Sequence, residues 1–295
     1  MSVVVVIPVY NRVGIVFSTI ESVVGQTRLP DHLVVVDDGS TDGLSEAFAA
    51  WEEKGGALGC PITFIQQSNQ GVASARNVGM KAFPDADWYA FLDSDDLWPR
   101  DFLERCLRSI SNSQDIVAAT LDREEICGGQ KSRIVDISEL IPDPQLWMFR
   151  YGAALLSGTL LKGDTVRELK GFAEEEFING GEDAHLLLRL ANLGQWIHVP
   201  GAPYQYRSGL GYPQHHESVS QSRHRWAFVF DEFYNEMATT DSARDRLFRK
   251  VLAKRWREAG DQHRRQGRKS LSAEAYKRSN SYSPNIRAYY GSLRL

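Results

Sequence analysis

Three aspartates stand within four residues in the first third of the sequence: Asp93, Asp95 and Asp96. Carboxylates this close repel one another, and either proton uptake or a bound cation relieves the repulsion. Mg²⁺ and Mn²⁺ prefer carboxylate oxygens as ligands. The spacing therefore indicates a divalent-cation site, although a turn followed by a helix cap near Pro99 would use the same residue types.

The elements that must position these aspartates are predicted to alternate between strand and helix. Hydrophobic periodicity predicts strands at 2–8, 32–36, 62–66, 88–92 and 153–161, and helices at 11–26, 42–54, 72–82 and from 182 onward. Loops are expected over 127–143, and only helical patterns follow residue 223. This alternation predicts βαβ units, a mostly parallel sheet flanked by helices, and a C-terminal helical extension.

Polar residues follow three of the predicted strands. They are Tyr10 and Asn11, Asp37 and Asp38, and Asp93 with Asp95. Ligands on parallel sheets bind beyond the carboxyl ends of the strands. We therefore expect these side chains to converge on one crevice.

Composition bounds the class of protein. The 295 residues are 42% hydrophobic and 24% charged, as in an ordinary globular protein, and the formal net charge of −4 argues against a nucleic-acid partner. Cys60, Cys106 and Cys127 lack metal-ligand spacing, which favours reduced thiols in a cytosol-like compartment. The N-terminal apolar run is too short to span a bilayer and lacks a basic leader, so a cytoplasmic location is expected.

Four stretches, in this order, resemble the motifs of the family 2 glycosyltransferases. They are VVVIPVYNR (4–12), VVVDDGSTD (34–42), FLDSDD (91–96) and GGEDAHLLLR (180–189). The resemblance covers roughly residues 2–220. It implies the Rossmann-like GT-A fold and a nucleotide-diphosphate sugar as donor.

The resemblance assigns donor-binding residues. The first two motifs imply a uridine pocket formed by Pro8, Tyr10, Arg12, Asp37 and Asp38. An aromatic ring offers a face for stacking, and a carboxylate accepts the imide N–H of uracil. NQGVASARNVG (69–79) resembles the segment that reaches the ribose and diphosphate, with Arg76 as the cation.

The same resemblance assigns the metal and the base. Asp93-Ser94-Asp95 matches the DXD motif, which implies that Asp93 and Ser94 face the ribose and that Asp95 binds Mn²⁺ or Mg²⁺. Glu182 and Asp183 match the ED motif, in which the aspartate is the general base of inverting members. A helix cap is the alternative for Asp183, and a capping role is expected for Asp96.

The segment YQYRSGLGYPQHHESVS (204–220) resembles the closing segment of the family. It implies that Arg207 meets phosphate and that His215 or His216 completes the metal shell. Residues 208–214 lengthen the usual gap before the histidine. A surface histidine therefore stays open as an alternative.

These expectations combine into one function. The chain is expected to transfer a single sugar from a nucleotide-diphosphate sugar, most simply a UDP-sugar, with inversion, to a hydroxyl of a saccharide or lipid-linked glycan acceptor. A GT-A domain is expected over 1–222 and a helical region over 223–295. A non-catalytic nucleotide-sugar or carbohydrate-binding protein and a sugar nucleotidyltransferase are the alternatives.

The C-terminal region is basic. Residues 241–270 carry eleven Lys and Arg against four Asp and Glu. A solvated helical face is the simplest interpretation. Peripheral contact with the inner, anionic face of a membrane and docking against a second subunit in a homodimer are the alternatives.

Overall fold

The computed structural model describes residues 1–56, 59–110, 115–152, 155–176, 178, 180–209, 219–237 and 242–284. The chain forms two compact units, which are described separately. The first unit comprises Met1–Pro144, Ala154–Glu174 and Arg189–Tyr212, and the second comprises Gln145–Ala153, Glu175–Leu188 and Pro213–Leu295. The domain boundary expected near residue 222 stays a prediction.

Strands and helices alternate through the first half of the chain. The order is β1 (Val3–Val9), α1 (Val13–Val24), β2 (His32–Asp37), α2 (Leu44–Glu53), β3 (Ile62–Gln66), α3 (Val72–Ala82), β4 (Trp88–Phe91), α4 (Phe102–Ile110), β5 (Ile116–Cys127), β6 (Gln130–Val135), η1 (Ser138–Leu140), α5 (Pro144–Tyr151), η2 (Leu156–Gly158), β7 (Thr159–Lys162), α6 (Gly163–Glu168), α7 (Glu182–Leu190), β8 (Gln195–Ser208), α8 (Val219–Glu236), α9 (Ser242–Arg265) and α10 (Lys269–Tyr282).

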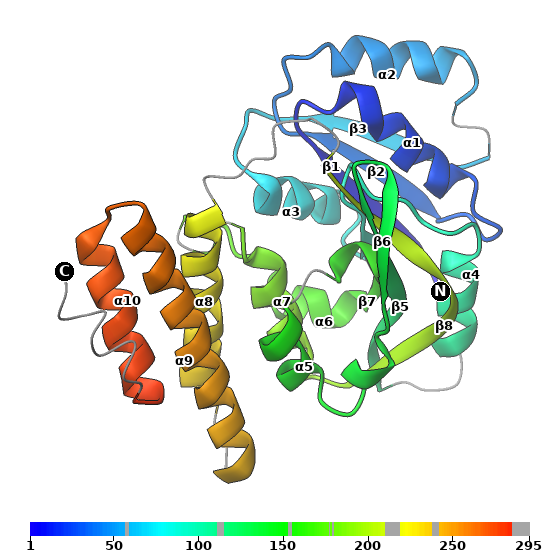
Figure 1. Cartoon of the computed structure of the whole chain (residues 1–295). Helices are drawn as coiled ribbons and strands as arrows, with labels where there is room; N and C mark the ends of the chain where they lie inside the picture. The colour runs from blue at the N-terminus through cyan, green and yellow to red at the C-terminus, as the bar shows by residue number, and fades with distance from the viewer. Residues whose placement is uncertain are drawn as a thin grey trace. The chain divides into compact units, whose positions relative to one another are not determined.

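One sheet organises the first unit (Figure 1). Its order is β3-β2-β1-β4-β7-β5-β6, with β8 paired to β5. The pairs β2–β3, β1–β2, β1–β4 and β5–β8 are parallel, whereas β7 is antiparallel to both of its neighbours and β6 is antiparallel to β5. The predicted mostly parallel sheet is therefore confirmed, and β1 is an interior strand between β2 and β4.

Helices cover both faces of β1, which explains why every residue of that strand is buried. Val3, Val5 and Ile7 share one core with apolar residues of α1, α2 and α4. On the opposite face α3 approaches closely, because Gly79 lies against Val6 and Val36 with no room for a Cβ. A strand covered on both faces reads as a continuous apolar run rather than as an alternating one.

The second half of the sheet differs from expectation. The strand expected at 153–161 begins only at Thr159, after the short helix η2, so that prediction is wrong over residues 155–158. The loop expected over 127–143 contains the edge strand β6 and the short helix η1. Both β5 and β8 were absent from the predicted elements, and β8 contains Pro200, Gly201 and Pro203.

Helices α8, α9 and α10 pack together in the second unit (Figure 1) around Ala227, Trp256, Ala259 and Ala275. The buried carboxylate of Asp231 accepts hydrogen bonds from Trp256 Nε1 at 2.8 Å, from Arg278 at 3.2 Å and from the Tyr282 hydroxyl. The expected C-terminal helical extension is confirmed. None of the helices described is long and apolar enough to cross a membrane.

Several basic residues of the C-terminal region are structural. Arg255 donates to Phe149 O at 3.0 Å and lies over the Phe230 ring, and burial lowers the pKa of its guanidinium to about 10. Arg249 donates to Tyr282 O at 3.2 Å.

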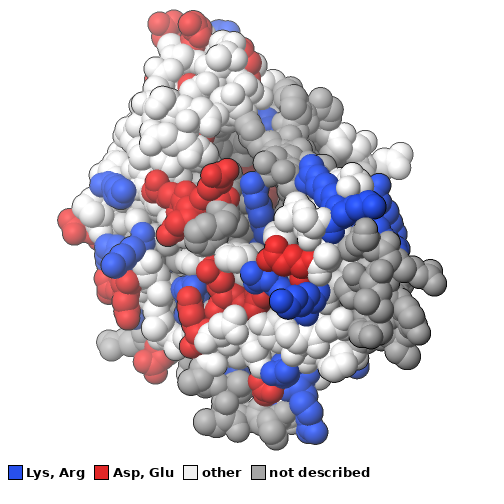
Figure 2. Space-filling model, turned by 90° about the vertical axis from the view of Figure 1, so that its left-hand side faces the viewer, with Lys and Arg blue, Asp and Glu red and all other residues white. Residues whose placement is uncertain are grey.

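On the face drawn in Figure 2, Lys and Arg side chains lie among Asp and Glu side chains. Membrane contact stays a prediction, which cosedimentation with anionic vesicles would test.

Candidate active site

The turns after β1 and β2 are joined to each other. Asn11 has a positive φ of 51°, which asparagine tolerates better than most residues. Its N–H donates to Ser40 Oγ at 2.9 Å, and its Oδ1 accepts the Thr41 N–H at 2.8 Å. These bonds fix the segment that carries Tyr10 and Arg12 against the end of the neighbouring strand.

Pro8 lies near the carboxyl end of β1, an interior strand, where a proline is normally unfavourable. The last register pair between β1 and β4 joins Val6 to Phe91, so Pro8 lies beyond the end of β4. Its position pairs with Val36 of β2. The missing N–H of Pro8 is tolerated because β4 has ended there.

The carboxylates of Asp37 and Asp38 are buried at the end of β2. Asp37 accepts the Ser40 N–H at 2.8 Å and Gln66 Nε2 at 3.2 Å. Asp38 accepts three bonds, from Gln67 Nε2 at 2.7 Å and from the N–H groups of Gln70 at 2.8 Å and Gly71 at 2.9 Å. Asp38 therefore anchors the loop that enters α3, while Asp37 keeps more capacity to accept a further donor. Nucleotide contact by either residue stays a prediction.

Two arginines pair with the aspartates that follow β4. Arg76 of α3 donates to Asp93 Oδ1 at 2.7 Å, and Arg12 lies 3.3 Å from Asp95 Oδ2. The side chain of Arg76 is only 5% exposed and lies 5.1 Å from the centre of the Phe172 ring. The structure therefore joins four residues expected from three separate motifs at one edge of the sheet.

Burial and charge raise the pKa values of two of the aspartates. Burial and the neighbouring Asp93 carboxylate raise the pKa of Asp95, although Arg12 opposes the shift. Burial, followed by the charges of Asp93 and Asp95, raises the pKa of Asp96 well above its ordinary value. A divalent cation stabilises the ionised form of nearby carboxylates. The donor set and its mutual repulsion therefore fit Mg²⁺ or Mn²⁺.

Asp96 is not a helix cap, so the expected role is wrong. Helix α4 begins at Phe102, six residues later, and Asp96 is 1% exposed. Its Oδ1 accepts the backbone N–H of Arg207 at 3.0 Å. The residue connects the aspartate loop, which is the turn of residues 93–96 after β4, to β8.

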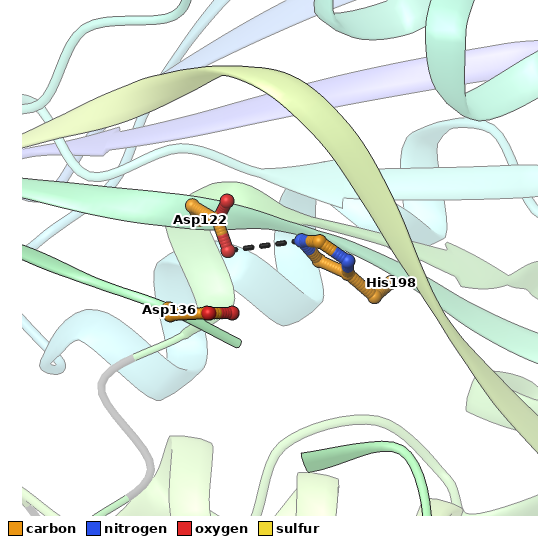
Figure 3. Close-up of side chains that lie close together, drawn as sticks. All are labelled: Asp122, Asp136 and His198. Atoms are coloured by element: carbon orange, nitrogen blue, oxygen red, sulfur yellow. Dashed lines mark hydrogen bonds and ion pairs between the residues drawn. The ribbon is translucent and has the colours of Figure 1, made fainter. Parts of the chain in front are cut away.

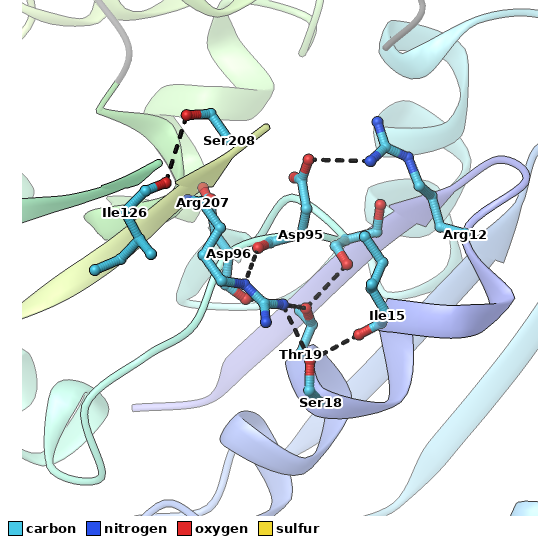
Figure 4. Close-up of polar contacts among 10 residues, drawn as sticks. Arg12, Ile15, Ser18, Thr19, Asp95, Asp96, Ile126, Arg207 and Ser208 are labelled. Carbon is cyan, nitrogen blue, oxygen red and sulfur yellow. Dashed lines mark hydrogen bonds and ion pairs between the residues drawn. The ribbon is translucent and has the colours of Figure 1, made fainter. Parts of the chain in front are cut away.

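Side chains of α1 and β8 donate hydrogen bonds to the backbone of the aspartate loop and hold it in place (Figure 4). The buried hydroxyl of Thr19 on α1 lies 3.0 Å from Ser94 O and 2.9 Å from Asp96 O. Arg207 Nε donates to Asp95 O, and its terminal nitrogen donates to Ser18 Oγ at 3.0 Å. The guanidinium of Arg207 thus lies between α1 and the loop. A phosphate contact by Arg207 stays a prediction.

The predicted base residues begin α7 in the second unit. Glu182 Oε2 accepts the Gly180 N–H at 2.8 Å, and Asp183 Oδ1 accepts the Ala184 N–H at 2.7 Å. Asp183 therefore satisfies an N–H of the first turn of α7, whereas Glu182 holds the glycine turn that precedes the helix. Acidic side chains are favourable at helix starts. This arrangement is compatible with a second role as base, which stays a prediction. His215 and His216 lie outside the described residues.

A second cluster gathers Asp122, Asp136 and His198, whose ligand atoms lie within 4.8 Å of one another (Figure 3). His198 Nε2 lies 2.9 Å from Asp122 Oδ1, which also accepts the Ile137 N–H at 2.8 Å. Asp136 accepts the Ser138 N–H at 2.8 Å, and hydrogen bonding to the Ser138 side chain, followed by this backbone bond, lowers the pKa of its carboxyl. These hydrogen bonds fix the loop after β6, so the cluster has a structural role.

Sequence reasoning missed three residues that hold the site, Thr19, Ser40 and Ser157, and placed a fourth, Asn11, at the crevice without naming its partners. Thr19, Asn11 and Ser40 act through the bonds given above, and Ser157 Oγ accepts the Asp93 N–H at 3.2 Å. No local pattern marks Thr19 or Ser157, because only the tertiary fold brings them to the loop. Ser40 lies inside a recognised motif but carried no assigned role, whereas Asn11 was expected at the crevice from its place after the first strand.

Curated bacterial proteins match part of the chain. The succinoglycan biosynthesis protein ExoW of Rhizobium meliloti is 40% identical over 111 residues, which are 36% of this chain and 33% of that protein. An uncharacterized glycosyltransferase of Rickettsia felis is 37% identical over 116 residues, 39% of this chain and 18% of that protein. The matched region therefore spans a third or less of either relative.

Solved structures share the fold. Residues 1–349 of S. aureus TarS in complex with UDP-GlcNAc match with a TM-score of 0.70 at 19% identity, over 98% of this chain and 83% of that one. The mannosyltransferase PcManGT from Pyrobaculum calidifontis, in complex with GDP-Man and Mn²⁺, matches with a TM-score of 0.63 at 17% identity, over 98% and 77%. The predicted GT-A fold is thereby confirmed.

The family described as glycosyl transferase family 2 matches residues 4–162, more than half of the chain. This range contains the turns after β1 and β2, Arg76 of α3, and the aspartate loop after β4. The chain belongs to glycosyl transferase family 2.

Proposed function

We propose that this protein transfers a single sugar from a nucleotide-diphosphate sugar to an acceptor hydroxyl with inversion. The observation that carries the proposal is the pairing of Asp93 and Asp95 with Arg76 and Arg12 at the carboxyl edge of the sheet. An edge of this kind is where parallel sheets bind ligands. Family membership and the UDP-GlcNAc and GDP-Man complexes of structural neighbours support a nucleotide-sugar donor.

The donor is proposed to lie across the ends of β2, β1 and β4. Asp37 and Tyr10 would contact the nucleobase and ribose, and Asp93 and Ser94 the ribose side. Arg76 is fixed by its pair with Asp93 and by the Phe172 ring, so its charge is available near a diphosphate without further ordering. A UDP-sugar is the first candidate.

Asp95 is proposed to hold Mn²⁺ or Mg²⁺. A bound divalent cation would neutralise charge on the departing diphosphate. The crowding of Asp93, Asp95 and Asp96 supports a cation here, and the structural neighbour PcManGT is in complex with Mn²⁺. His215 or His216 as a further ligand belongs to the same proposal.

Asp183, with Glu182 beside it, is proposed as the general base. The base takes the proton of the acceptor hydroxyl while that oxygen attacks the anomeric carbon from the side opposite the diphosphate. Inversion follows from this in-line geometry. A saccharide or lipid-linked glycan supplies the hydroxyl, and ExoW, as a succinoglycan biosynthesis protein, supports a saccharide acceptor.

A donor screen tests the proposal. Purified protein is incubated with UDP-sugars and GDP-sugars in the presence of Mn²⁺, and release of the nucleoside diphosphate is measured. We expect release from at least one donor, and Asp95→Asn should lower it by at least tenfold because an aspartate ligand is lost. Asp122→Asn, which changes an aspartate of the second cluster, should retain the activity. Binding of a donor without any release would favour the non-catalytic alternative.

A further inference from the structure

Two consecutive glutamines at the end of β3 bond to two different aspartates. Gln67 is half-buried, and its Nε2 donates to Asp38 Oδ1 at 2.7 Å. Asp38 also accepts backbone N–H groups of the loop that enters α3, so Gln67 belongs to the anchor of that loop. Gln66 is exposed, and its Nε2 donates to Asp37 Oδ2 at 3.2 Å. Its partner is the aspartate that is proposed to contact the nucleobase.

Asp37 and Gln66 lie opposite each other in the sheet. They form the last pair of the parallel register between β2 and β3, so their side chains project from the same face. A carboxylate only accepts hydrogen bonds, and the Gln66 amide is therefore held with its nitrogen toward Asp37. The second N–H of that nitrogen remains beside the carboxylate. The carboxyl ends of β2 and β3 thus present an acceptor next to a donor.

The two oxygens of Asp37 are each engaged once. Oδ1 accepts the Ser40 N–H at 2.8 Å, and Oδ2 accepts Gln66 Nε2. A carboxylate oxygen has two acceptor positions, so each oxygen can still accept one donor. The Gln66 amide nevertheless covers the approach to Oδ2. The pair can accept one N–H that is flanked by a carbonyl group, but it is poorly suited to two N–H groups side by side.

Uracil and guanine differ in this respect. Uracil presents N3–H beside the carbonyl oxygen O4, which matches an acceptor next to a donor. Guanine presents N1–H and the 2-amino group side by side, and both fit a carboxylate whose two oxygens are open. A site whose polar groups stay unmatched by a ligand rejects that ligand. The arrangement of Asp37 and Gln66 therefore favours uracil.

We propose that Gln66 is a specificity-determining residue that selects uridine nucleotides over guanosine nucleotides. Asp37 accepts N3–H of uracil, and the Gln66 amide donates to O4. The same amide keeps Asp37 from accepting both donors of guanine. The inference rests on the proposed function, because it takes Asp37 as the nucleobase contact, and it adds the residue that decides which nucleotide carries the sugar.

Isothermal titration calorimetry on the full chain tests the selection, with UDP and GDP as titrants in saturating Mn²⁺. We expect the wild type to bind UDP at least about tenfold more tightly than GDP. Gln66→Ala removes the donor to O4 and opens Oδ2. Its affinity for UDP should fall about tenfold, the scale of one hydrogen bond, while its affinity for GDP stays the same or rises.

Two further variants separate the hydrogen bond from other effects. Gln66→Met keeps the length of the side chain without its amide, so it should lose UDP affinity as Gln66→Ala does. A loss confined to Gln66→Ala would assign the effect to side-chain volume and overturn the proposal. Gln130→Ala is the matched control, because it removes an exposed glutamine of β6, at the other end of the strand order. Its affinities for both nucleotides should equal those of the wild type.

The remaining outcomes distinguish this inference from the proposed function. Gln66 variants that keep the wild-type ratio of UDP to GDP affinity overturn the selection, as does a wild type that binds GDP as tightly as UDP. Both results leave nucleotide binding intact. A wild-type protein that binds neither nucleotide in the presence of Mn²⁺ contradicts the proposed function itself and the inference with it.

Discussion

A carboxylate that both bonds the first turn of a helix and removes a proton is the most demanding assignment at the scale of single residues. Asp183 accepts the Ala184 N–H at the start of α7, so Asp183→Asn, which keeps an acceptor oxygen, should preserve the helix turn. The amide lacks the basicity to take the proton of an acceptor. Turnover should therefore fall about 10²–10⁴-fold while the donor still binds.

Steady-state kinetics with saturating donor would measure this loss, and a calorimetric titration would check donor binding. Glu274→Gln, which neutralises an exposed acid of the second unit paired with Arg278, should retain wild-type turnover. An Asp183→Asn enzyme as fast as the wild type would remove Asp183 from the role of base.

Helix α1 does more at the scale of elements than cover the sheet, because Thr19 ties it to the carbonyl groups of Ser94 and Asp96. Thr19→Val keeps the side-chain volume but leaves two buried carbonyl groups without this donor. We expect the free energy of unfolding to fall by about 1–3 kcal/mol, measured by urea denaturation.

The control for this change is Thr27→Val, which removes an exposed hydroxyl that donates to Glu104 at 2.7 Å. Its effect should stay within about 0.5 kcal/mol, as for most surface substitutions. If the two variants lose equal stability, the hydroxyl of Thr19 does not hold the loop.

The sequence predicted those strands and helices that are marked by a hydrophobic pattern within their own residues. Strand β3 and helix α3 have the predicted bounds, because each is one apolar or amphipathic run between turn residues. Strand β6 was missed because it is a polar edge strand, and β8 because Pro200 and Pro203 interrupt it. Their pairing depends on β5, a partner distant in sequence from β8.

The residues of the site divide in the same way, into those marked by a sequence motif and those placed only by the tertiary fold. Motif spacing identified Asp93, Asp95, Arg12 and Arg76, which the structure brings together in two ion pairs. It did not identify Thr19, whose hydroxyl acts across 75 positions of sequence. Nor did spacing predict that Asp96 would bind the backbone of Arg207, because that bond requires β8 beside the aspartate loop.

At the scale of the whole molecule, stability should depend on pH through a histidine pair in the second unit. His224 Nδ1 and His263 Nε2 lie 3.1 Å apart between α8 and α9. Burial is the main cause that lowers the pKa of both rings. The charges of Arg278 and Arg225 also lower the pKa of His224, and those of His224 and Arg268 lower the pKa of His263, while Glu274 opposes both shifts. The folded chain therefore resists protonation of the pair.

The sign of the effect follows from linkage. Below the ordinary histidine pKa of about 6.5 the unfolded chain binds more protons than the folded one, so the free energy of unfolding should fall as the pH decreases through this value toward the lowered pKa. Urea denaturation between about pH 7.5 and 5.5 would measure it. The double variant His224→Gln/His263→Gln should lose part of the slope, and an unchanged slope would exclude the pair as its source.

The central claim is that the aspartate loop after β4 binds the metal of a nucleotide complex. Anomalous diffraction at the manganese edge, from crystals grown with Mn²⁺ and UDP, tests it most directly. The account predicts a manganese peak about 2.1 Å from a carboxylate oxygen of Asp95, with UDP across the ends of β1, β2 and β4. A manganese ion bound instead by Asp122, Asp136 and His198, or a nucleotide bound away from these strand ends, would contradict it.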